Sequence, residues 1–303
     1  MEPVAYDDEP SALARILELT GRANGDDAAV LRAGSSPVCV STDSTVAGVH
    51  APVGTPPHAL GRRAAARALS DLAAMGAAPL GMTCAVHVPE GAWGEAVHLV
   101  EGIIERGDEQ RAELVGGDLC RTPATALAVT VTVFGRRSGA RHDGFVTRAG
   151  ARASHDLYVT GAIGAATAAL RGGARELPEP PDRIRAGIAL APFASAMLDL
   201  SDGIGRDART LAAASRVHAA IELELVPLAP GVDDPVAAVE GGDDYELLLA
   251  IPPARVDAAR HALAAVDSKL VLTRIGSCAD GPVGASFTRG GVAVEVTGGF
   301  THT

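Results

Sequence analysis

Short apolar runs that end in acidic or hydroxyl residues recur along the chain. The apolar runs 38–40, 114–115 and 196–198 are followed by Ser41-Thr42-Asp43, Gly116-Gly117-Asp118 and Asp199-Leu200-Ser201-Asp202, respectively. A buried strand shows this pattern when its apolar residues cross a core and its polar residues begin where the core stops. The pattern therefore predicts strands that end at these acids and place carboxylates at their tips.

Helical and strand periodicities fill the rest of the chain. Helices are predicted over 58–76, 93–106, 163–170, 204–214 and 253–265, with a short further helix that starts near Ser11. Strands are predicted over 80–88, 125–134, 156–160, 247–251, 269–276 and 291–296. Because strands and helices do not alternate strictly, the predicted fold class is α+β (mixed α/β) rather than a doubly wound sheet.

The length of 303 residues is sufficient for two domains of ordinary size. Residues 136–156 have little periodicity, so the predicted domains are 1–140 and 141–303. Hydrophobic residues make up 47% of the chain and aromatic residues only 3%. The core is therefore expected to consist of Ala, Val, Leu and Ile, and Cys39 and Cys84 are expected to be small core residues.

The formal net charge of −11 argues against nucleic acid or an anionic membrane surface as a partner. The chain has no CxxC pair, which argues against a zinc site or a redox dithiol. No signal peptide and no apolar run of about 20 residues is present, so a cytoplasmic location is expected. The one lysine, Lys269, follows no glycine-rich loop, which excludes a Walker A motif.

The acids at the predicted strand ends and in the first helix are too numerous for one general acid and base pair. They are Asp27, Asp43, Asp71, Asp118, Asp199 and Asp202. Hard oxygen donors in this number suit several Mg²⁺ ions on a polyphosphate, and phosphoryl transfer depends mainly on positioning and charge neutralisation. Asp26 stands beside Asp27, and two adjacent like charges require a cation or solvent nearby. Spacing alone leaves the phosphoryl acceptor open.

Six motifs occur in the order found in thiamine-monophosphate kinases, and the chain resembles that family from about residue 25 onward. They are Gly25–Ala29, Ser41–Asp43 with Gly48–His50, Leu69–Ala77, Val115–Asp118, Leu198–Gly203 and Gly241–Leu247. The family shares a superfamily with aminoimidazole ribonucleotide synthetase, selenophosphate synthetase and a hydrogenase-maturation dehydratase. The resemblance implies two α/β domains and a cleft where ATP, several Mg²⁺ ions and thiamine phosphate meet.

The implied reaction is direct transfer of the γ-phosphoryl group of ATP to thiamine phosphate, which gives thiamine diphosphate. The resemblance also implies a homodimer whose N-terminal sheets pair, and the β-branched segment 125–134 is the expected edge. Implied metal ligands are Asp26, Asp27, Ser41, Thr42, Asp43, Asp71, Asp118, Asp199 and Asp202, and Asp43, Asp71, Asp118 and Asp202 are the expected catalytic residues. Implied ATP contacts are Gly117, Asp118, Arg148 and Ser201, and implied acceptor contacts are His50 and Asp243.

The chain departs from the family pattern at several positions. Asp243 stands where Glu is usual, Leu119-Cys120 replaces a hydroxyl pair, Gln110 replaces an aromatic residue, and the ending 299–303 lacks the usual terminal aromatics. These positions surround the expected base and acceptor sites. A phosphotransferase of the same build with another small-molecule acceptor is therefore the main alternative. A non-catalytic nucleotide sensor or dimerisation module is disfavoured, because binding alone would not need so many acids.

Overall fold

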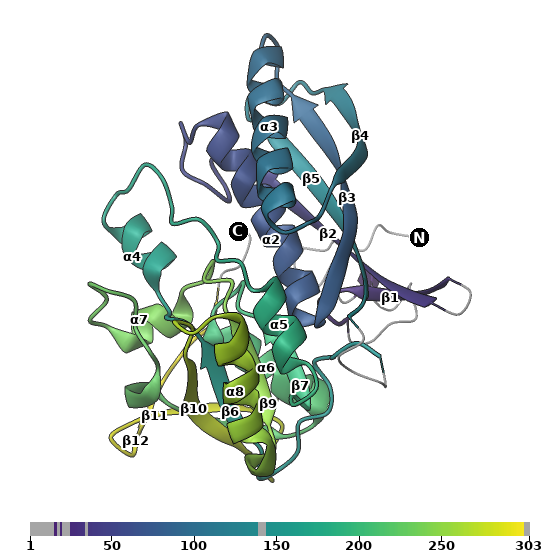
Figure 1. The fold of residues 1–303 in the computed structure, drawn as a ribbon. Coiled ribbons are helices and arrows are strands. Elements are labelled where there is room, and N and C mark those ends of the chain that lie inside the picture. The colour runs from purple at the N-terminus through teal and green to yellow at the C-terminus, as the bar shows by residue number, and fades with distance from the viewer. Residues whose placement is uncertain (1–14, 17–18, 20–24, 34–35, 139–143, 300–303) are drawn as a thin grey trace, which may run out of the picture.

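Two β-sheets with helices packed on them form the computed structural model (Figure 1). It describes residues 15–16, 19, 25–33, 36–138 and 144–299, so the start of the helix predicted near Ser11 lies outside the described residues. The mixed α/β class predicted from the sequence is confirmed. No helix within these ranges combines the length and the apolar character needed to cross a membrane.

The first sheet has five strands in the spatial order β1-β2-β5-β3-β4. Their bounds are β1 Ala29–Ala33, β2 Ser36–Val46, β3 Ala77–Val88, β4 Leu114–Arg121 and β5 Ala128–Arg137. Only the β3–β4 pair is parallel. Helices α2, Pro57–Ala74, and α3, Trp93–Glu109, lie on one face of this sheet (Figure 1). Gly61 of α2 and Gly102 of α3 let these helices approach, because a Cβ at either residue would lie about 2 Å from a carbonyl oxygen of the other helix.

The prediction that strands end at the acids is wrong for β2 and β4. Strand β2 continues through Ser41-Thr42-Asp43 as far as Val46, and β4 continues past Asp118 to Arg121. The physical reason is that these polar residues stay in register with a neighbouring strand, for example Asp43 opposite Val131 of β5. The carboxylates therefore project from the faces of the strands.

The prediction that segment 125–134 forms an exposed edge is also wrong. Strand β5 lies in the middle of the sheet, hydrogen-bonded to β2 on one side and to β3 on the other. Its Val129, Val131 and Val133 are buried under α2, which explains the β-branched composition without any second copy. The outer strands of this sheet are β1 and β4.

The second sheet has seven strands in the order β12-β11-β8-β10-β6-β9-β7. The bounds are β6 Asp156–Thr160, β7 Ala196–Asp199, β8 His218–Glu222, β9 Leu247–Ile251, β10 Leu272–Ala279, β11 Gly284–Arg289 and β12 Val292–Val294. Strand β9 is buried along its full length because its side chains enter two cores in alternation. Leu247 and Leu249 face the core shared with α2, whereas Leu248 and Ala250 face the core on the other side of the sheet.

The remaining helices are α4 Ala165–Arg171, α5 Ile184–Leu190, α6 Ile204–Ser215, α7 Pro235–Glu240 and α8 Val256–Val266, with 3-10 turns at Leu223–Leu225 and Pro253–Arg255. Helix α6 packs on the second sheet, against β7, β8, β9 and β11. The predicted helices and the strands over 156–160 and 247–251 are confirmed, with small shifts at their ends. Helices α5 and α7 and strands β8 and β11 were not predicted. The division into domains 1–140 and 141–303 stays a prediction.

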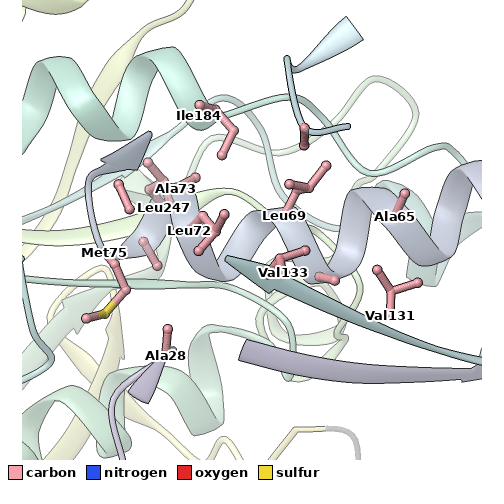
Figure 2. Close-up of a cluster of buried hydrophobic side chains, with 14 of the residues drawn as sticks. Ala28, Ala65, Leu69, Leu72, Ala73, Met75, Val131, Val133, Ile184 and Leu247 are labelled. Atoms are coloured by element: carbon pink, nitrogen blue, oxygen red, sulfur yellow. The ribbon is translucent and has the colours of Figure 1, made fainter. Parts of the chain in front are cut away.

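Helix α2 joins the two halves through one continuous core. Figure 2 shows Leu69 and Leu72 of this helix among Val133 of the first sheet, Ile184 of α5 and Leu247 of the second sheet. Gly187 of α5 sits directly on α2, since a Cβ there would lie 2.0 Å from the Ala73 carbonyl oxygen. Cys39 and Cys84 are buried in this core, as predicted. The core fixes α2, and therefore Asp71, between the two sheets.

Candidate active site

A cavity of about 520 Å³ lies between the two halves, where α2 and β2 face the second sheet. This volume falls in the range of small-molecule sites. One part of its lining is acidic and comes from β2, α2, β7 and the turns that follow β7 and α7. The other part is mostly aliphatic and comes mainly from segment 48–52 and α4. Lining residues include Thr42, Asp43, Val49, His50, Pro52, Arg67, Asp71, Leu170, Leu177, Asp199, Ser201, Asp202, Asp243 and Tyr245.

Three of the predicted metal ligands meet in one cluster, whose carboxylate oxygens all lie within 4.8 Å of one another. Asp27 precedes β1, Asp71 lies on α2, and Asp199 ends β7. Burial, together with the neighbouring carboxylates Asp199 and Asp27, raises the pKa of Asp71 well above its ordinary value. Burial and Asp27 likewise raise the pKa of Asp199 to about 7. The cluster therefore favours a proton or a bound cation at neutral pH.

Arg148 stabilises the acidic pair Asp26-Asp27 from the segment that joins the two sheets. Its Nη2 donates to Asp27 Oδ1 at 2.8 Å, and its backbone N–H donates to Asp26 Oδ1 at 2.9 Å. Burial nevertheless raises the pKa of Asp27, and its second oxygen, Oδ2, has no hydrogen-bond partner. A buried, unpartnered carboxylate oxygen beside two further carboxylates matches the oxygen-only ligands of Mg²⁺, so these residues fit that ion.

The consecutive residues Ser41, Thr42 and Asp43 are divided between the two faces of β2. The Ser41 hydroxyl donates to Asp71 Oδ2 at 2.6 Å, and Asp43 pairs with Arg67, so both side chains point toward α2. The Thr42 hydroxyl instead lies 3.0 Å from that of Thr132 on β5. Side chains alternate along a strand, so the Thr42 hydroxyl points away from the face that carries Ser41 and Asp43.

Ser201 and Asp202 line the cavity between β7 and α6, as the third motif predicted. Arg206, one turn further along α6, lies 3.4 Å from Asp202 through its Nη1. The buried Asp207 accepts a hydrogen bond from the Asp202 backbone N–H at 3.2 Å and so holds the turn in place. Burial, with Asp202 and Asp199 nearby, raises the pKa of Asp207 well above its ordinary value.

The acids of segment 243–246 each have a different partner. Asp243 pairs with Arg63 of α2, and Asp244 accepts from the Gly164 N–H at 2.7 Å, next to the start of α4. Glu246 accepts two hydrogen bonds of 2.6 Å from Arg183 and one of 2.7 Å from Thr160. Asp243 and Tyr245 have positive φ angles of 72° and 50°, which non-glycine residues adopt only uncommonly.

Arg63 links three segments of the chain beside the cavity. Its Nε donates to the His50 carbonyl at 3.1 Å, its Nη1 donates to the Pro178 carbonyl at 2.9 Å, and its Nη2 pairs with Asp243. The predicted acceptor residue His50 lines the cavity, and its Nδ1 accepts from the Val46 N–H at 3.0 Å. This hydrogen bond places the ring proton of neutral His50 on Nε2. Arg63 therefore joins Asp243 to His50 at the cavity, and their role as acceptor contacts stays a prediction.

Gly117 and Asp118 are not brought to this cavity. They lie on the outer strand β4, and β3 and β5 separate β4 from β2. Both residues are exposed, and a Cβ at Gly117 would lie 2.2 Å from the Cys84 carbonyl oxygen of β3. Strand order is not readable from motif order, so the sequence could not exclude this separation. Their expected roles in metal and ATP binding stay predictions.

Sequence reasoning missed Arg63 and Arg67, which bring positive charge to the acidic site. A signal was present, because Arg63, Arg67 and Asp71 are spaced four residues apart and therefore share one face of the predicted helix. It also missed the buried Tyr245, whose hydroxyl pKa is raised well above its ordinary value by burial. The aliphatic wall residues Leu170 and Leu177 gave no signal, since isolated leucines are common in any helix or loop.

The fold and the acidic cleft define a protein of the AIR synthase-related class, and residues 25–137 match the family model "AIR synthase related protein, N-terminal domain". A thiamine-monophosphate kinase from Halobacterium salinarum is 36% identical over 90% of this chain and 94% of its own length. One from Synechococcus elongatus is 35% identical over 76% of this chain and 77% of its own length. The chain belongs to the thiamine-monophosphate kinase family.

Solved structures agree with this family assignment. The structure of AaThiL complexed with AMPPCP and TMP matches with a TM-score of 0.83 at 25% identity and covers 100% of both chains. The thiamine-monophosphate kinase from Stenotrophomonas maltophilia matches with a TM-score of 0.74 at 31% identity, over 94% of this chain and 96% of that one. Hydrogenase maturation protein HypE, at 19% identity and a TM-score of 0.71, shares the fold.

Proposed function

We propose that this protein phosphorylates thiamine monophosphate to thiamine diphosphate with ATP, by direct phosphoryl transfer. The observation that carries the proposal is the cluster of Asp27, Asp71 and Asp199 at the cavity, in a chain of the thiamine-monophosphate kinase family. Two phosphate-bearing substrates can approach such a site only if cations offset its charge. The related AaThiL was solved with AMPPCP and TMP, which are an ATP analogue and the proposed acceptor.

The residues that would hold Mg²⁺ are Asp27, Asp71 and Asp199, with Asp26, Ser41, Thr42, Asp43, Asp118 and Asp202 as further candidate ligands. Bound Mg²⁺ would neutralise charge on the phosphates as the phosphoryl group moves. Ser41 orients Asp71 through a 2.6 Å hydrogen bond, and Arg148 orients Asp27 through one of 2.8 Å. These fixed side chains would align donor and acceptor, which is the main contribution of a protein to phosphoryl transfer.

Gly117, Arg148 and Ser201 are proposed ATP contacts, and His50 and Asp243 are proposed acceptor contacts. Of these residues, Ser201, His50 and Asp243 line the cavity. Val49, Pro52, Leu170 and Leu177 are the aliphatic part of the cavity wall, to which His50 also contributes. Such a wall would cover the rings of an acceptor while its phosphate faces the acids.

We also propose that the protein is a homodimer that pairs through its N-terminal sheets in the cytoplasm. Strand β4 is an outer strand, and Val115 and Leu119 on it are 62% and 52% exposed. An apolar outer strand invites pairing with a second chain. Light scattering at micromolar concentration would give twice the mass of one chain, and a monomer alone would refute the pairing.

A phosphotransferase with another acceptor is the second candidate function. The observation that favours it is the pairing of Asp243 with Arg63, because a carboxylate held by an arginine is less available to a cationic acceptor. Incubation with ATP, Mg²⁺ and thiamine monophosphate, followed by chromatography, tests both candidates. Formation of thiamine diphosphate and ADP in equal amounts supports the first. Absence of thiamine diphosphate from a folded, ATP-binding protein refutes it.

A further inference from the structure

Arg67 brings a permanent positive charge to the acidic end of the cavity. Its Nε donates to Asp43 Oδ2 at 3.0 Å, and its Nη2 donates to Asp43 Oδ1 at 3.3 Å. The guanidinium carbon lies over the ring of Tyr245, 5.9 Å from the ring centroid. Among the described residues that line the cavity, Arg67 is the one arginine or lysine, and five aspartates and Glu240 line the same cavity.

The guanidinium and a divalent cation compete for Asp43. A Mg²⁺ ion on a carboxylate oxygen stands about 2.1 Å from it. The guanidinium nitrogens already stand 3.0 and 3.3 Å from the same carboxylate, so the two cations would lie close together and repel. Asp43 is also absent from the cluster of Asp27, Asp71 and Asp199, because its carboxylate is turned toward Arg67.

A guanidinium displaced from Asp43 would have a phosphate within hydrogen-bonding distance. A phosphate oxygen that shares an ion with Asp43 would lie roughly 3–4 Å from the Asp43 oxygens, given metal–oxygen distances of about 2.1 Å. This is close to the distance at which Arg67 already sits. The planar fork that holds a carboxylate also holds a phosphate, so Arg67 would exchange one anion for another with little movement.

We propose that Arg67 is a phosphate-binding residue that Asp43 holds in position until a divalent cation takes its place on Asp43. The proposal rests on the proposed function, since it requires phosphates in this cavity. It makes cation and phosphate binding depend on each other: the cation releases Arg67, and the phosphate gives Arg67 a new partner. Each ligand should therefore increase the affinity of the other by the same factor.

The test is Arg67→Met, which removes the charge and keeps an unbranched side chain, with calorimetry of Mg²⁺ on nucleotide-free protein and of AMPPCP at saturating Mg²⁺. We expect Mg²⁺ alone to bind about tenfold tighter, because its competitor is gone. We expect AMPPCP or thiamine monophosphate to bind about tenfold to a hundredfold more weakly, the usual cost of losing a charged hydrogen-bond pair. Arg274→Met, which removes a surface arginine paired with Asp156 and Glu222, should change neither affinity.

Arg67→Lys keeps the charge without the fork, so it should leave Mg²⁺ affinity near the wild-type value and still weaken phosphate binding. It also provides a readout if Arg67→Met does not fold. Unchanged or weaker Mg²⁺ binding in folded Arg67→Met would overturn the proposal, as would unchanged binding of both phosphate ligands. Failure of the proposed function gives a different result, because the wild type would then bind AMPPCP with Mg²⁺ and form no thiamine diphosphate.

Discussion

Replacing Asp71 with Asn should make the protein more stable without metal and less stable with it. The change removes one negative charge from a cluster whose oxygens lie within 4.8 Å of one another. The new side chain keeps an oxygen that accepts from Ser41, and its NH₂ group can donate to Asp27 or Asp199. Removal of the charge therefore leaves the local hydrogen bonding intact.

The magnitude follows from the distances in the cluster. Two unit charges 4.8 Å apart repel by roughly 3.5 kcal/mol at an effective dielectric constant of about 20. The full repulsion is not present at pH 7, because the raised pKa values of Asp71 and Asp199 leave the cluster partly protonated. A gain of about 1–3 kcal/mol in the free energy of unfolding remains, which corresponds to a rise in Tm of a few degrees.

Thermal unfolding followed by circular dichroism, in EDTA and in Mg²⁺ with AMPPCP, measures both effects. The wild type should gain about 4.1 kcal/mol when ligand is present at about a thousand times its Kd, and Asp71→Asn should gain much less. The order of the two Tm values should therefore reverse between the buffers. Asp108→Asn, an exposed change on α3, is the matched control and should leave both Tm values unchanged. A Tm below that of the wild type in EDTA would refute the argument, since it would mean that the cluster is not repulsive.

Three further predictions concern single carboxylates. Asp43→Asn should lower kcat by at least about a hundredfold with the fold intact, because it removes a proposed metal ligand and the partner of Arg67. Turnover near the wild-type value would contradict this role of Asp43. Asp243→Glu should lower KM for thiamine monophosphate if the pocket serves another acceptor, and should change it little if thiamine monophosphate is the substrate, as steady-state kinetics would show. Asp244→Asn should remove a pH dependence of stability. Burial raises the pKa of the Asp244 carboxyl in the folded protein to about 7 from an ordinary 3.8, so the folded protein binds the carboxyl proton more tightly than the unfolded chain does. The stabilisation that this proton provides is lost as pH rises from about 4 to 7. In urea unfolding with EDTA, the variant should therefore gain on the wild type by up to about 1.4 kcal/mol per pH unit between pH 5 and 7, and parallel curves would contradict it.

The long periodic elements were predictable because their environment is uniform along their length. Helix α2 buries a stripe that includes Leu60, Ala64, Ala68 and Leu72, so helical spacing is visible in the sequence. Strand β9 is buried on both faces and appears as an uninterrupted apolar run. Strand β8 was missed because its five residues, His218–Glu222, mix polar and apolar side chains without a distinctive pattern.

The order of strands in a sheet has no local signal, and it accounts for the larger errors. Segment 125–134 was predicted to be an edge from its β-branched composition, but that composition fits a central strand under a helix equally well. The same uncertainty placed Asp118 with Asp43 because both follow apolar runs. In the structure β4 and β2 are separated by two strands, so about 14 Å of sheet lies between them at the usual strand spacing.

The acids of the site were predictable as a set, whereas their partners were not. Asp27, Asp71 and Asp199 are far apart in sequence, and only the motifs predicted that they would converge, as the structure shows they do. Asp43 belongs to the same set of motifs, yet its carboxylate pairs with a guanidinium rather than joining the cluster. The reason is that Arg67 lies one turn before Asp71 on α2 and forms an ion pair with Asp43. A cation supplied by the chain itself is invisible to a search for acidic ligands. The sequence signal for Arg67 is its four-residue spacing from Asp71, which places both side chains on one face of α2.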